Sequence, residues 1–351
     1  MNYYNPNQNP NQNQAYYQYQ QANQQAFQAM MLRQQIEKGK KAQRKEIIKA
    51  GLLLGAALIM YLLIQTVMVL MLTSFGMMDA YENSVAFQYG FNVIAVHLAS
   101  MLIPFGIMAL ILKKNFISPF FPAQRVEKKQ AFAWIGFGMG GCIAANLITS
   151  YIMTVSKNVF GYELKENGYD GPDSILSCVV LVVSTMIIPA VCEEIALRCC
   201  ALGVLKKFGK GFSVFAVSIV FGLMHANAVQ FIFAFLVGLI LAYITIKTDN
   251  VVLAMIVHGL NNGISVLSDI LEFSISEKTG ETVSVVIFYA WAIIGVGCLI
   301  YLAVKGLLKI QKQPKSVYDN SFFVKLLCLL PGLFIPLVSL ISLTAQYITK
   351  V

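Results

Sequence analysis

The chain has 351 residues, of which 57% are hydrophobic and only 12% are charged, and its formal net charge is +9. The charged share is about half that of a typical soluble domain, and apolar stretches of about 20 residues recur, so we expect a polytopic membrane protein. The basic residues cluster in loops and beside apolar stretches, which argues against nucleic acid as a partner and for membrane lipids.

The N-terminal 49 residues divide into two segments. Residues 1–30 carry no charge and contain sixteen Asn or Gln and five Tyr, a composition that predicts a disordered tail. Residues 31–49 carry seven Lys or Arg against two Glu, which predicts a basic juxtamembrane helix near anionic lipid headgroups. The first apolar stretch begins near residue 50, too far along for a cleavable signal peptide, so we expect an uncleaved anchor.

The apolar stretches are continuous rather than alternating, which favours helices over a barrel. We therefore expect an all-α bundle of about eight or nine transmembrane helices within residues 50–347. The predicted spans lie near 50–73, 91–112, 131–155, 174–198, 212–227, 229–246, 251–271, 284–304 and 323–347. The loops alternate between basic and acidic, which predicts a multi-pass cell-membrane protein with a cytoplasmic N-terminus and, with nine spans, an external C-terminus.

The seven cysteines form no CxxC pair, and most lie in apolar stretches. We interpret them as buried apolar side chains rather than as a disulfide framework or a cysteine-based metal site. They are Cys142, Cys178, Cys192, Cys199, Cys200, Cys298 and Cys328.

The fourth span ends in AVCEEIALRCC, where charges are costly. Glu194 and Arg198 are four residues apart, so they share a helix face and can pair. Glu193 lies about 100° around the helix and can point into a cavity. The alternative is an ordinary helix end whose charges extend to the membrane surface.

Two further motifs place polar side chains on apolar helices. FGLMH puts His225 one turn after Phe221, and HGLNN puts Asn262 one turn after His258. The alternatives are a satisfied core histidine and hydrogen bonding between helices.

On the predicted boundaries His258 lies about 11 Å inside the membrane and His225 about 20 Å, so the two residues differ in depth. His97, alone in its span, is interpreted as structural.

Together these residues predict amide hydrolysis by one of two routes. Glu193 can act as a general base on water while His and Asn side chains stabilise an oxyanion. Alternatively Glu193, His225 and His258 can hold a divalent metal such as zinc with an open position for water. The sequence therefore leaves open whether the cofactor is a metal or none.

The motifs EEIALR, FGLMH and HGLNN resemble, in this order, the EExxxR, FxxxH and HxxxN motifs of the CPBP family, the CAAX-protease and bacteriocin-processing enzymes also called Abi. The resemblance implies an intramembrane endopeptidase, a hydrolase with a catalytic core at about residues 131–271. It implies peptide or lipidated-protein substrates, including prenylated CAAX proteins or bacteriocin precursors, cleaved near the cytosolic side. Both metalloendopeptidase and metal-free mechanisms have been proposed for the family.

Residue by residue, the resemblance implies Glu193 as the base that activates water, supported by Glu194 and Arg198. It implies that His225 orients the water and that His258 and Asn262 form the oxyanion pocket.

Two other functions are compatible with the same residues. A non-catalytic membrane immunity or binding protein would use the same fold without cleavage. A transporter with a proton relay through buried Glu and His is disfavoured, because the chain has no internal repeat.

Overall fold

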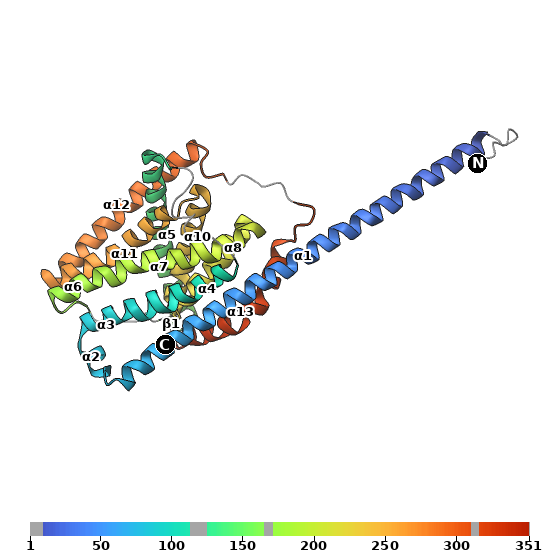
Figure 1. The fold of residues 1–351 in the computed structure, drawn as a ribbon. Coiled ribbons are helices and arrows are strands. Elements are labelled where there is room, and N and C mark those ends of the chain that lie inside the picture. Colours follow the sequence, from blue (N-terminus) through green and yellow to red (C-terminus); the bar gives the residue numbers. More distant parts are fainter. Residues whose placement is uncertain (1–9, 113–124, 165–170, 310–315, 351) are drawn as a thin grey trace.

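The computed structural model describes residues 10–112, 125–164, 171–309 and 316–350 (Figure 1). Among them the α-helices are α1 Pro10–Ser74, α2 Met78–Asn83, α3 Val85–Asn92, α4 Ile103–Ile111, α5 Lys128–Phe160, α6 Ile175–Leu181, α7 Ile188–Glu194, α8 Gly203–Leu205, α9 Lys210–Met224, α10 Ala228–Thr248, α11 Val251–Ser274, α12 Glu277–Val304 and α13 Phe322–Ala345. The π-helical segments are η1 Val93–Leu102, η2 Val182–Ile187 and η3 Ile195–Leu202, and η4 Lys206–Phe208 is a 3₁₀ turn. Strands β1 Tyr162–Leu164 and β2 Ile348–Lys350 pair antiparallel and join the end of α5 to the end of the chain.

The expected all-α, polytopic membrane fold is confirmed. Eight helices in the described part of the chain are long and apolar enough to cross a membrane, among them the continuous rods Val85–Ile111 and Ile175–Phe208. The predicted span at 212–227 is instead the short helix α9, whose 15 residues measure about 22 Å, less than the roughly 30 Å of a bilayer core. Helix α9 packs against α10 as a hairpin.

The N-terminal part differs from the predicted disordered tail. Residues 10–30 form the beginning of α1, a helix of 65 residues that projects from the bundle as a single rod (Figure 1). Residues 1–9 lie outside the described part. Ala and Gln favour helix, and the stretch is continuous with the membrane-crossing part of α1, so no separate nucleation is needed. The basic residues 31–49 lie in the same helix.

The apolar part of α1 packs against α13, which runs beside it. Gly51 and Gly55 face α13, and a Cβ atom at Gly55 would overlap the backbone of Gly332. Small residues four apart let two membrane helices approach this closely. The Arg44 side chain donates to Asn320 Oδ1 at 2.9 Å, which fixes the register of the pair.

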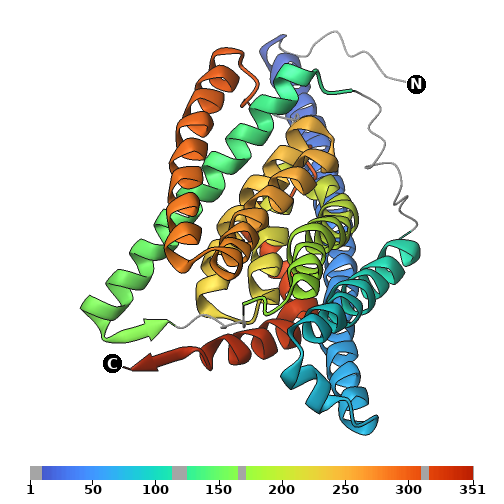
Figure 2. The same cartoon turned by 90° about the vertical axis from the view of Figure 1, so that its left-hand side faces the viewer.

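Two apolar clusters make up most of the core. The first joins residues of α1, α4, η3, α9 and α13, and the second joins residues of α5, α10, α11 and α12. In Figure 2, α12 and α5 lie side by side at the edge of the bundle, where they pack together. The helix that carries Glu193 contributes Leu197 to the first cluster, and α11 contributes Val257 to the second. The candidate site therefore lies where the two clusters meet.

Candidate functional site

The helix that carries the two glutamates is continuous but changes its winding next to Pro189. Proline has no N–H to donate to the carbonyl of Thr185 four residues earlier, and the preceding segment η2 is wound as a π-helix. The side-chain amide of Asn262 on α11 donates to the Thr185 carbonyl oxygen at 3.0 Å. One N–H of Asn262 therefore satisfies the backbone at the proline, and its second N–H remains for other partners.

Glu194 and Arg198 form a fully enclosed ion pair. Both side chains have 0% exposure, and Glu194 Oε1 lies 3.1 Å from Arg198 Nη1. The guanidinium also lies 4.7 Å from the centre of the Phe221 ring, and its Nη2 donates to the carbonyl of Gly238 at 3.5 Å. The pairing predicted from the spacing of four is thus present, and the alternative of surface charges is wrong for these two residues.

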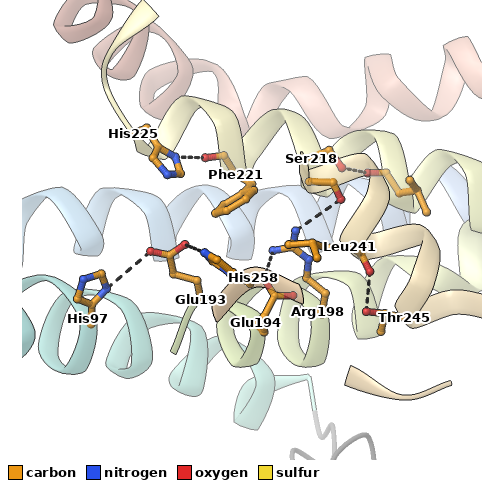
Figure 3. Close-up of polar contacts among 12 residues, drawn as sticks. His97, Glu193, Glu194, Arg198, Ser218, Phe221, His225, Leu241, Thr245 and His258 are labelled. Atoms are coloured by element: carbon orange, nitrogen blue, oxygen red, sulfur yellow. Dashed lines mark hydrogen bonds and ion pairs between the residues drawn. The ribbon is translucent and has the colours of Figure 1, made fainter. Parts of the chain in front are cut away.

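His258 connects this pair to Glu193. Its Nδ1 lies 3.0 Å from Glu194 Oε1, and its Nε2 lies 3.8 Å from Glu193 Oε2 (Figure 3). A carboxylate only accepts hydrogen bonds, so Nδ1 carries the proton. In the neutral ring the Nε2 lone pair then faces Glu193.

The Glu193 carboxylate lies between two imidazole rings, those of His97 and His258 (Figure 3). Glu193 Oε1 is 3.7 Å from His97 Nδ1, and the residue is 8% exposed. Its Oε2 is buried and has no hydrogen-bond partner among the described residues. Separations of 3.7 and 3.8 Å exceed direct hydrogen bonds, and one water can bridge such a distance. Glu193 thus differs from Glu194, which is fully buried and paired with Arg198, in being slightly exposed and within reach of water.

His225 ends α9 and presents its ring toward the Glu193 carboxylate (Figure 3). The backbone N–H of His225 bonds to the Gly222 carbonyl, so the Phe221 carbonyl receives the His225 Nδ1 proton instead, at 2.9 Å. The Nε2 lone pair of the neutral ring is then left to accept a hydrogen bond. The next residue, Ala226, has a left-handed φ of 51°, and Asn227 caps α10, so the turn after His225 is tightly defined.

The depths of Glu193 and His225 agree because the helix with the glutamates is longer than predicted, whereas His258, seven residues after the start of α11, still lies about 10 Å from that helix end. The helix with the glutamates continues to Phe208 rather than ending at residue 198, which places Glu193 about 22 Å from Phe208. His225 follows the 15 residues of α9, which also measure about 22 Å. Glu193 thus lies in the middle of its helix rather than near the end at which it was predicted.

His97 was expected to stand apart, and that expectation is wrong. All three histidines of the chain gather around Glu193. A sequence signal was present, because an ionisable residue inside an apolar span is a functional candidate by default. His97 belongs to no motif with i, i+4 spacing, so spacing within one helix does not connect it with Glu193.

Glu193, His225 and His258, the residues of the metal-dependent alternative, do not form a ligand set in the structure. Within residues 10–112, 125–164, 171–309 and 316–350, no three His, Cys, Asp or Glu side chains are arranged to hold a metal ion. The Nδ1 atom of each of these histidines faces another acceptor, which leaves Nε2 as the remaining nitrogen of the ring.

Residues 175–264 match the family model described as type II CAAX prenyl endopeptidase Rce1-like. The match agrees with the CAAX-protease family indicated by the three motifs. No curated protein and no solved structure matches the chain. The matched segment contains the six candidate site residues of the three motifs, whereas His97 lies outside it.

Proposed function

Since the chain carries an Rce1-like domain of the CAAX-protease family at residues 175–264, we propose that it is an intramembrane endopeptidase that hydrolyses peptide or lipidated-peptide substrates. The observation that carries the proposal is the buried Glu193 carboxylate. It has one oxygen without a hydrogen-bond partner among the described residues, and imidazole rings lie 3.7 and 3.8 Å away. A charge at this depth is costly to insert, by roughly 2.5–3.5 kcal/mol, which favours a chemical role.

In the proposed mechanism Glu193 is the general base. Glu193 Oε2 and the Nε2 lone pairs of neutral His225 and His258 are acceptors, and a water molecule among them can donate to Glu193 and to one of the two rings. Glu193 takes one proton from the water, and the water oxygen forms a bond to the carbonyl carbon. The π electrons of the carbonyl move to its oxygen. The C–N bond then breaks, its electron pair stays on nitrogen, and the proton on Glu193 moves to the leaving amine.

Glu194 and Arg198 are proposed to support the base without exchanging protons with the substrate. Their fully enclosed pair holds the Nδ1 proton of His258 and so sets the orientation of that ring. A buried pair of this kind is strongly destabilised when one partner is removed.

Asn262 is proposed to stabilise the oxyanion. Asn262 offers its second N–H, because the first is engaged by the Thr185 carbonyl. His258 is the other oxyanion residue that the resemblance implies, but Glu194 engages the one proton of its neutral ring, so its Nε2 is an acceptor. Loss of one oxyanion donor typically costs about 10²–10³ in kcat.

We propose that the N-terminus and the basic end of the bundle face the cytosol. Lys207 pairs with Glu46, Lys206 pairs with Asp249, and Lys247 donates to the carbonyl of Lys309. These contacts bring the middle of α1, η4, the end of α10 and the segment after α12 to one side with their basic residues, as the positive-inside rule requires of a cytoplasmic face.

The test compares peptide termini in membranes that carry the wild type or Glu193→Gln at matched protein levels. We expect new termini only with the wild type, and they would identify the substrate class, prenylated or not. If Glu193→Gln yields the same termini, the protein is better described as a non-catalytic immunity or binding protein.

A further inference from the structure

His97 has no role in the mechanism above, although it is one of two histidines nearest to Glu193. It lies on η1, outside the Rce1-like segment, and its side chain is 14% exposed. Its Nδ1 is buried without a hydrogen-bond partner among the described residues, and Glu193 Oε1 is 3.7 Å away. The segment that carries it is π-helical, a winding that is frequent at functional sites.

The donors around Glu193 are few. His225 and His258 each commit the Nδ1 proton elsewhere, to the Phe221 carbonyl and to Glu194, so their neutral rings present lone pairs. Arg198, one turn along on the same helix, directs its charge at Glu194 rather than at Glu193. Among the side chains that Figure 3 places near Glu193, His97 is thus the one whose N–H is not already committed.

We propose that His97 is a positioning residue for Glu193. Its Nδ1–H donates to Glu193 Oε1, either through one bridging water or after a small approach of the two side chains. The bond fixes the plane of the carboxylate, so that Oε2 faces the attacking water. The inference rests on the proposed function and adds a helix upstream of the Rce1-like segment to the catalytic machinery.

The test uses the purified full-length chain in liposomes and a quenched fluorogenic peptide built on the cleavage site that the terminus comparison identifies. Four variants are compared with the wild type: His97→Ala, His97→Asn, Glu193→Gln and the control Leu98→Ala. Leu98 is the next residue on η1 and is 41% exposed, so its truncation perturbs the same helix without touching Glu193. Thermal unfolding of each variant is recorded alongside.

We expect His97→Ala to lower kcat about 10- to 100-fold, the loss typical of a hydrogen bond to a charged group, with KM within about twofold. His97→Asn places an amide N–H near the position of Nδ1 and should recover most of the lost kcat. Leu98→Ala should match the wild type.

Wild-type kcat in His97→Ala, with Glu193→Gln inactive, would overturn the role of His97 and leave the proposed function intact. Equal losses in His97→Ala and His97→Asn, or a rise confined to KM, would also overturn it, because donation would then not be the property that matters. Identical fragments from the wild type and Glu193→Gln would instead contradict the proposed function itself.

Discussion

The enclosed pair of Glu194 and Arg198 offers a prediction about stability that does not depend on a substrate. Arg198→Met keeps most of the apolar stem but removes the charge, which leaves the Glu194 carboxylate with His258 as its remaining partner among the described residues. Breaking a buried pair by removing one member costs about 3–5 kcal/mol, whereas replacing both members by neutral groups is often close to neutral. We therefore expect Arg198→Met to lose about 3–5 kcal/mol and the double variant with Glu194→Gln to lose clearly less.

The assay is equilibrium unfolding in mixed micelles, followed by circular dichroism as the fraction of SDS rises. Lys207→Met is the matched control, because Lys207 pairs with Glu46 at 2.6 Å but both side chains are more than half exposed. An exposed pair contributes about 0–1 kcal/mol, so this variant should unfold almost as the wild type does. Arg198→Met within about 1 kcal/mol of the control, or additive single and double variants, would refute the argument from burial.

Three further predictions concern other parts of the molecule. Asn262→Leu should lower the free energy of unfolding by about 1–3 kcal/mol, because the Thr185 carbonyl loses its donor; unchanged stability in the same SDS titration would contradict this. Gly55→Leu should destabilise the packing of α1 on α13 by about 1–3 kcal/mol through overlap with Gly332, and limited proteolysis of α1 no faster than in the wild type would count against it. Treatment with a strong chelator should leave cleavage unchanged, and loss of activity that zinc restores would favour the metal-dependent route instead.

The sequence predicted the parts of the site that depend on helical spacing. Glu194 and Arg198 pair as residues four apart should, and the polar residues of the three motifs come from successive helices into one region. The same periodicity and the cost of charge in lipid predicted the all-α membrane fold. These features are local or compositional, so they can be read without knowledge of the tertiary structure.

The features that were missed depend on long-range packing or on helix ends. His97 meets Glu193 because η1 packs against α7, a contact that no spacing within one helix encodes. The helix through Glu193 continues to Phe208 because its last turns are buried among other helices although they include Lys206 and Lys207. Residues 10–30 are helical because they extend a helix that is already formed in the membrane-crossing part of α1, so they need no nucleus of their own. Their composition alone does not indicate this.

The central claim is that Glu193 activates water to cleave a peptide bond. The most direct test incubates the purified chain in liposomes with its peptide substrate in ¹⁸O-labelled water. The masses of the fragments are then measured by mass spectrometry. The mechanism predicts one ¹⁸O atom in each new C-terminus with the wild type and no new C-terminus with Glu193→Gln. Labelled fragments at the wild-type rate from Glu193→Gln would contradict it.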